Sequence, residues 1–320
     1  MQASEDNRPS WVSVLERASH GNRGRTLFKV VPYFFSALLF LSGLLAVAAP
    51  LPLLLMAHQQ KQRDLGRLGG AVIFNAALVF ALSKSVYQGA FFILTVAPIV
   101  MGIPVLFERY RYRFDRVVLL LWVGLMAGIT AFVVGYSLFS AQMSPWAWMG
   151  GEIQNALKML VEAGASLPQE MTEAELVQKV LQELPSALGL MLFTAAGLNT
   201  LLFLSWSRAS YRQRIGFTWD TLSQWRAPEI LVWPTLFVGA GVVFDAGWMS
   251  IVAANLLRLF LAVYAAQGLC ILWTIFEKVG VKGGLRVFLL GVSAVFASPI
   301  VVGLGFFDLW IDFRAKFRQS

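Results

Sequence analysis

The stretch of sequence that decides the fold is residues 248–276, WMSIVAANLLRLFLAVYAAQGLCILWTIF. Arg258 is its only charged residue, and the run is long enough to cross the roughly 30 Å hydrocarbon core of a bilayer as one helix. We therefore predict a transmembrane helix here. A charge at the centre of such a helix costs about 2.5–3.5 kcal/mol on insertion scales, so Arg258 is expected to face a partner or a water-filled cavity.

Similar apolar runs lie along most of the chain. Pro50 and Pro52 interrupt the first of them, because proline breaks the helical hydrogen-bond ladder, and a short second segment should start there. We predict an all-α fold, a polytopic transmembrane helical bundle of about 8–9 membrane segments with an external amphipathic helical insertion. The apolar runs are 31–57, 69–83, 87–107, 117–139, 186–206, 230–244, 248–276 and 285–307.

The composition supports the same class of protein. Of the 320 residues, 58% are apolar and 14% are charged, and the mean hydropathy is +0.66. Soluble domains have about 45–50% apolar and about 25% charged residues, so this chain is not a typical soluble domain. The same values exclude a disordered, collagen-like or coiled-coil chain. One cysteine and two histidines also argue against an internal disulfide and a His/Cys metal site.

The charges between the apolar runs predict the orientation. Lysine and arginine gather in loops on the cytoplasmic side of membrane proteins, whereas residues 140–185 hold six glutamates and two lysines and are predicted to be external. We expect a multi-pass protein of the bacterial inner (cytoplasmic) membrane. The charges leave open the side of the C-terminus, and whether the runs 31–57 and 285–307 cross once or form broken hairpins. The basic loops are 58–67, 108–116, 207–229 and 277–286.

These features divide the chain into five parts. The external part holds two amphipathic stretches, and Thr172 with Glu175 forms a capping-box pattern that opens the second. The two stretches either lie in the membrane interface or roof a cavity. The parts are a polar N-terminal cytoplasmic tail (1–26), N-terminal membrane helices (27–139), the external amphipathic segment (140–185), C-terminal membrane helices (186–313) and a basic C-terminal tail (314–320).

Polar residues within the apolar runs are the candidate site residues. Asn255 precedes Arg258 by three positions and therefore lies near the same helix face. Such side chains either line a pocket for an anionic or zwitterionic ligand, or Arg258 forms a structural ion pair, with Asp308 as the first partner to test and Asp245 as the second. The candidates for ligand-binding or buried polar roles are Arg258, Asn255, Asp308, Gln267, Asn75 and Asn199.

The sequence carries no motif of a known catalytic site. It has no P-loop, no H-E-x-x-H and no G-x-S-x-G elbow, so we predict no enzymatic activity, no cofactor and no metal. The net charge of +8 arises in the basic loops, and no basic stripe with interleaved aromatics suggests a nucleic-acid partner. The expected partners are the lipid bilayer, a small-molecule ligand and other membrane proteins.

Three C-terminal motifs carry a resemblance to a known family. They are Trp225-Arg-Ala-Pro228, then Asn255 with Tyr264-Ala-Ala-Gln267-Gly268, then Gly303-Leu-Gly-Phe-Phe-Asp308-Leu-Trp-Ile-Asp312-Phe-Arg314. Through them the chain resembles the YybS-like family of uncharacterised bacterial multi-pass membrane proteins. With Pro50-Leu-Pro52 and Leu68-Gly69-Gly70, the N-terminal half is distantly similar to the substrate-binding subunits of energy-coupling-factor transporters and to the rod-shape protein MreD.

Two functional hypotheses follow. The similarity to transporter subunits, together with the polar residues in apolar runs, favours a small-molecule-binding or transport-related membrane protein. The similarity to MreD, together with the external amphipathic segment, favours a non-catalytic membrane scaffold of an envelope or cell-morphogenesis complex.

Overall fold

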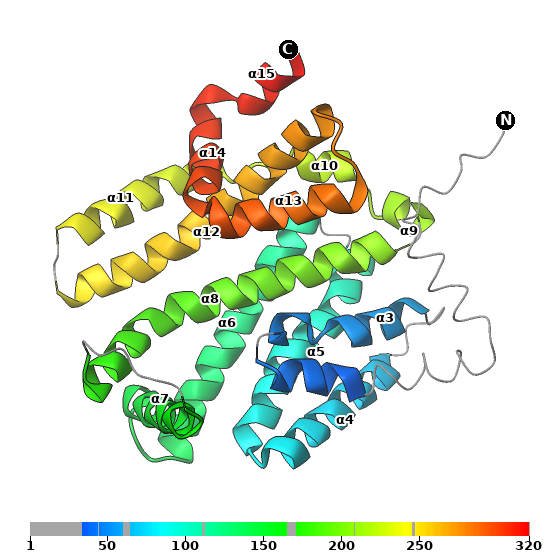
Figure 1. Cartoon of the computed structure of the whole chain (residues 1–320). Helices are drawn as coiled ribbons and strands as arrows, with labels where there is room; N and C mark the ends of the chain where they lie inside the picture. Colours follow the sequence, from blue (N-terminus) through cyan, green and yellow to red (C-terminus); the bar gives the residue numbers. More distant parts are fainter. Residues whose placement is uncertain are drawn as a thin grey trace. The chain divides into compact units, whose positions relative to one another are not determined.

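The computed structural model is helical and contains no strand in the part of the chain that it describes (Figure 1). Within that part, five helices are long and apolar enough to cross a membrane, or six if the bent pair α13–α14 counts as one span. The predicted all-α membrane fold is confirmed at this level, and the higher count of 8–9 segments stays a prediction. The described residues are 34–43, 45–59, 65–110, 113–164, 171–207, 209–244 and 247–319.

The five candidate spans coincide with the apolar runs 69–83, 87–107, 117–139, 186–206 and 248–276. Lipid offers no hydrogen-bond partner to the backbone, so a run of this kind satisfies its N–H and C=O groups internally as a helix. The predicted runs 31–57, 230–244 and 285–307 instead form shorter, broken or bent helices. The five spans are α4 (Leu65–Ser83), α5 (Val86–Glu108), α6 (Phe114–Phe139), α8 (Glu173–Trp206) and α12 (Trp248–Lys278).

The helices belong to two compact units, and α6, α8 and α13 have residues in both. The first unit comprises Met1–Leu121, Thr194–Phe217 and Lys282–Leu285, and it contains α3 (Leu51–Gln59), α4, α5 and α9 (Ala209–Arg214). The second comprises Trp122–Phe193, Thr218–Val281 and Arg286–Ser320. Its shorter elements are α7 (Pro145–Glu162), α10 (Trp219–Ser223), η2 (Glu229–Leu231), α11 (Val232–Val243), α13 (Gly283–Phe296), α14 (Ser298–Ile311) and α15 (Phe313–Gln319).

The break predicted at the two prolines of the first apolar run is present. Residues 34–41 are helical, a short turn η1 (Ala46–Ala48) follows, and α3 begins at Leu51. The predicted N-terminal tail, residues 1–26, lies outside the described residues. An irregular segment therefore precedes α3 in the described part of the first unit. Its backbone groups need hydrogen-bond partners from elsewhere in the chain.

Helix α8 joins two elements that the sequence analysis treated as separate. The predicted capping box opens it: the Thr172 N–H and hydroxyl donate to Glu175 Oε2 at 2.8 and 2.9 Å, and the Glu175 N–H donates to Thr172 Oγ1 at 3.3 Å. The helix then continues through Pro185 for 34 residues, a length of about 51 Å. The predicted boundary at 185 thus falls inside one helix, and the external location of 140–185 stays a prediction.

In the second unit, α11 and α12 form an antiparallel hairpin, and α14 crosses the C-terminal half of α12 (Figure 1). The crossing is a backbone-to-backbone contact. A Cβ atom on Gly268 would lie 1.9 Å from the Val301 carbonyl oxygen, and one on Gly305 would lie 1.9 Å from the Tyr264 carbonyl oxygen. Only glycine allows two helices to approach this closely, so the two glycines determine where α14 meets α12.

Candidate polar site and cavity in the C-terminal unit

Apart from Asn255, the three motifs that carry the sequence resemblance meet at one place in the second unit. Gln267 of α12 is 3% exposed and Asp308 of α14 is fully buried. The Gln267 side chain donates from Nε2 to Asp308 Oδ2 at 3.0 Å, and its Oε1 accepts from the Ala227 N–H at 2.8 Å. One amide therefore ties the segment before η2 to α14, and all its polar atoms are used in doing so.

The buried carboxylate of Asp308 is neutralised by Arg314 of α15. Arg314 is 3% exposed, its Nη2 lies 3.2 Å from Asp308 Oδ2, and its Nη1 donates to the Ser223 carbonyl at 3.1 Å. Asp308 Oδ1 accepts from the Phe313 N–H at 3.0 Å. Burial has the largest effect on Arg314 and lowers its pKa, whereas the charge of Asp308 raises it. We call Gln267, Asp308 and Arg314 the Asp308 cluster.

A second, more exposed ion pair lies beside the Asp308 cluster. Arg226 Nη2 donates to Asp312 Oδ1 at 2.6 Å, and each side chain is 46% exposed. Asp312 is the C-cap of α14 and has a left-handed backbone conformation, with φ 45°. The hydrogen bond from Arg226 lowers the pKa of Asp312 below its usual range, and the same bond raises the pKa of Arg226. The pair holds the segment before η2 against the end of α14.

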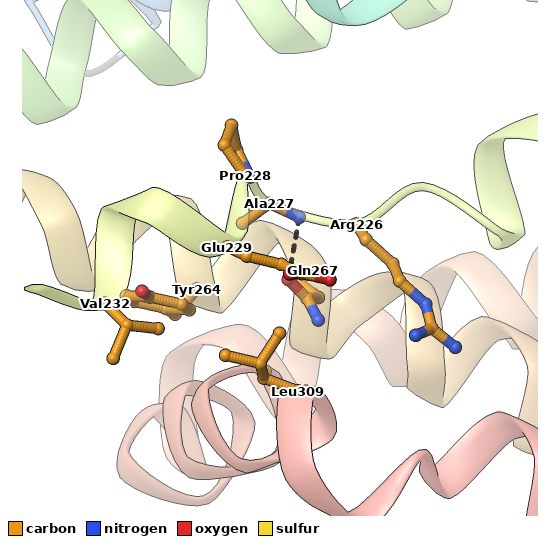
Figure 2. Close-up of a pocket in the computed structure, with 9 residues that line it drawn as sticks. Arg226, Ala227, Pro228, Glu229, Val232, Tyr264, Gln267 and Leu309 are labelled. Atoms are coloured by element: carbon orange, nitrogen blue, oxygen red, sulfur yellow. Dashed lines mark hydrogen bonds between the residues drawn. The ribbon is translucent and has the colours of Figure 1, made fainter.

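A cavity of about 200 Å³ opens between this segment, α11, α12 and α14 (Figure 2). Its apolar wall includes the ring of Tyr264, which contacts Phe306 edge-on with ring centroids 5.1 Å apart. Figure 2 shows Glu229 and Gln267 among the lining residues, with the Arg226 side chain extending away from them. The lining residues are Arg226, Ala227, Pro228, Glu229, Val232, Tyr264, Gln267, Gly305 and Leu309.

Asn255 repairs a break in the backbone ladder of α8. Pro185 has no N–H and distorts the turn before it, and the Ser186 N–H donates to Asn255 Oδ1 at 2.9 Å. Asn255 Nδ2 donates to the Gln182 carbonyl at 2.8 Å, and also to the Ile251 carbonyl of its own helix at 2.9 Å. The Asn255 amide is thus inserted between the N–H and the C=O that would be bonded to each other in a regular helix.

Arg258 lies at the same junction, and the prediction that it pairs with Asp308 was wrong. Arg258 Nη2 lies 3.6 Å from Glu183 Oε1, and Nη1 is 3.2 Å from Ser186 Oγ. Asp308 cannot be its partner because Asp308 meets α12 at Gln267, nine residues and about 13.5 Å further along the helix. The second expected partner, Asp245, lies outside the described residues. The Arg258 and Glu183 side chains are 43% and 52% exposed, so the pair is only half buried.

The two remaining predicted residues, Asn75 and Asn199, form hydrogen bonds with the backbone that precedes α3. Asn75 Oδ1 accepts from the Ala37 N–H at 3.0 Å, and Asn199 Nδ2 donates to the Val47 carbonyl at 2.8 Å. Both asparagines are fully buried. They satisfy backbone groups that the broken segment cannot satisfy itself, which is a structural role.

The six predicted residues thus occupy separate places. Gln267 and Asp308 are bonded to each other, and only Gln267 lines the cavity. Asn255 and Arg258 meet near Pro185, and each asparagine of the first unit lies apart from these two pairs. Six residues that complete these sites are not among the predicted candidates, although four of them lie in the three C-terminal motifs. The residues not selected are Glu183, Arg226, Glu229, Tyr264, Asp312 and Arg314.

Long apolar helices, a buried polar cluster and a small cavity define a polytopic α-helical membrane protein. The family model described as "Predicted membrane protein (DUF2232)" matches residues 30–309, which is most of the chain, and the chain belongs to this family. No curated protein and no solved structure matches it. The narrower resemblance to the YybS-like family, to transporter subunits and to MreD stays a prediction.

Proposed function

We propose that this chain is a membrane protein that binds a small molecule in the cavity between the segment 226–229, α11, α12 and α14. The observation that carries the proposal is the lining of that cavity. Known ligand sites are concave and mostly apolar, with a few polar groups that determine the orientation of the ligand. Here Tyr264, Val232 and Leu309 provide the apolar wall, and the exposed Glu229 provides a charge.

The size and charge of the cavity suit a small amphipathic molecule. At about 30 Å³ for each water-sized group, 200 Å³ holds roughly seven such groups. Arg226 is already paired with Asp312, and Gln267 uses both ends of its amide within the protein. Glu229 therefore offers the main charged contact, which favours a ligand with a cationic or hydrogen-bond-donating head and a short apolar body.

Native mass spectrometry of the full chain purified in mild detergent tests this proposal. We expect the wild-type protein to retain a small-molecule adduct. The variant Leu309→Trp places an indole into the cavity and should lose that adduct. The matched control is Phe307→Trp, on the same helix at a side chain that is 51% exposed, and it should retain the adduct. Lipids bound elsewhere on the surface should remain on both variants.

Two results would contradict the proposal. One is a wild-type protein that carries no small-molecule adduct beyond surface lipid. The other is an adduct that Leu309→Trp and Phe307→Trp retain equally, because the ligand would then bind elsewhere.

A further inference from the structure

The last two apolar helices cannot form one straight membrane span. Helices α13 and α14 have 14 residues each, so each is about 21 Å long, shorter than a hydrocarbon core of about 30 Å. They meet at Ala297 with a bend of 98°. None of the residues of α13 is buried, and its side chains are apolar except for Arg286 and Ser293, which share one face. A helix of that composition belongs in lipid or against other apolar helices.

The start of this pair lies beside the C-terminal end of α12. The guanidinium carbon of Arg286 lies 4.8 Å from the centre of the Trp273 ring. Arg286 also pairs with Glu277, with Nη1 to Oε1 at 3.2 Å, and donates from Nε to the Val281 carbonyl at 2.9 Å. These contacts hold the first turn of α13 at the end of α12 from which it emerges.

The other end of the pair returns to the same part of α12. At the end of α14, Asp312 pairs with Arg226, and Arg314 of α15 donates to the Ser223 carbonyl of α10. Helix α10 is itself beside the C-terminal end of α12, because the Trp219 ring stacks on Trp273 with centroids 5.8 Å apart. Both ends of the α13–α14 pair therefore lie near Trp273. The first end contacts Trp273 directly through Arg286, and the second is bound to α10, which packs on Trp273.

The close contacts of α14 along α12 agree with a shallow path. Gly305 meets Tyr264, and Asp308 meets Gln267. These residues of α12 lie at least 16 positions after its first residue, Trp248, which corresponds to about 24 Å. The contacts that position α14 thus lie in the C-terminal half of α12.

We infer that α13 and α14 form a re-entrant hairpin, which enters and leaves the membrane on the side where α12 ends. The C-terminus then lies on the same side as the basic segment 277–286. The cavity opens to that side as well, because its residues Arg226 and Glu229 belong to the segment held by Asp312. The importance of this opening rests on the proposed function, but the side to which the cavity opens is measured without a ligand.

Single-cysteine labelling of the full chain in cells tests the hairpin, in a Cys270→Ala background. Lys282→Cys and Lys316→Cys lie before and after the hairpin, and Ser140→Cys reports the loop between α6 and α7. We expect a membrane-impermeant maleimide to give the same result at Lys282→Cys and Lys316→Cys. Either both are labelled in intact cells, or both are labelled only after the cells are permeabilised. Opposite accessibility of these two positions would overturn the inference, because α13 and α14 would then cross the membrane.

Two further measurements complete the test. Phe296→Cys, at the bend, should not be labelled from the side that labels Ser140→Cys, and labelling from that side would contradict a re-entrant path. Glu229→Cys should be labelled from the side of Lys316→Cys. Labelling of Glu229→Cys only from the opposite side would refute the position of the cavity opening, while ligand binding itself would remain a separate result. A reporter protein fused after Ser320 determines the side of the C-terminus even if a cysteine variant folds poorly.

Discussion

Removing the arginine of the Asp308 cluster should destabilise the protein strongly. The variant Arg314→Met keeps the length of the side chain but leaves the fully buried carboxylate of Asp308 without a counter-charge. Removing one member of a buried ion pair costs about 3–5 kcal/mol. With an unfolding entropy of roughly 2.1 cal/mol/K per residue, a chain of 320 residues should lose about 4–7 °C in Tm.

A double variant separates the charge from the loss of packing. Asp308→Asn combined with Arg314→Met removes the buried charge and keeps an oxygen that accepts from the Phe313 N–H. One of the two hydrogen bonds to this side chain is lost, because Gln267 also needs an acceptor there, so a cost of about 1–3 kcal/mol should remain. The double variant should therefore melt at a higher temperature than Arg314→Met alone.

Thermal unfolding in detergent, followed by intrinsic tryptophan fluorescence at a fixed scan rate, measures these differences. The control is Arg226→Met, which breaks an ion pair that is 46% exposed on each side and should cost less than about 1 kcal/mol. The reasoning is refuted if Arg314→Met lowers Tm no more than Arg226→Met does. It is also refuted if the double variant is no more stable than the single one.

Three other variants test the remaining contacts. Asn255→Leu leaves an N–H and a carbonyl of α8 unpaired, at about 1–3 kcal/mol each, so it should lower Tm more than Arg258→Leu, and equal Tm values would contradict the bridging role. Gly305→Ala drives a Cβ against a backbone carbonyl at 1.9 Å and should abolish stable expression, whereas Gly303→Ala meets no atom within 4 Å and should express normally. Because its arginine partner lowers the pKa of Asp312, the stabilisation by that pair is present above the usual aspartate pKa and is lost as the pH falls through the lowered value, so Asp312→Asn should flatten this acid limb of a Tm–pH profile.

Much of the secondary structure could be predicted because the physical signal is local. A long apolar run must pair its own backbone groups in lipid, so the runs around 87–107, 117–139 and 248–276 appear as α5, α6 and α12. The capping box at Thr172 was also predictable, since its groups lie within one turn of each other. The continuity of α8 through Pro185 was not, because a residue of another helix repairs the break.

Five of the six candidate polar residues in the apolar runs are buried, whereas the Arg258 side chain is 43% exposed. Asn75, Asn199, Asn255, Gln267 and Asp308 are all less than 9% exposed. The cost of an unpaired polar group in an apolar setting is large enough that each of them has a hydrogen-bond partner. The same cost does not identify the hydrogen-bond partner of each buried side chain.

The sequence by itself therefore determined that this chain is a helical membrane protein, and it indicated five of the polar residues that its helices bury. Only the tertiary structure decided that Asp308 pairs with Arg314, that Arg258 pairs with Glu183, and that Gln267 closes one side of a cavity. The physical reason is range. Helix formation and capping depend on neighbours within a few residues. An ion pair depends on atoms within 4 Å in space, and those atoms come from helices that are far apart in the chain.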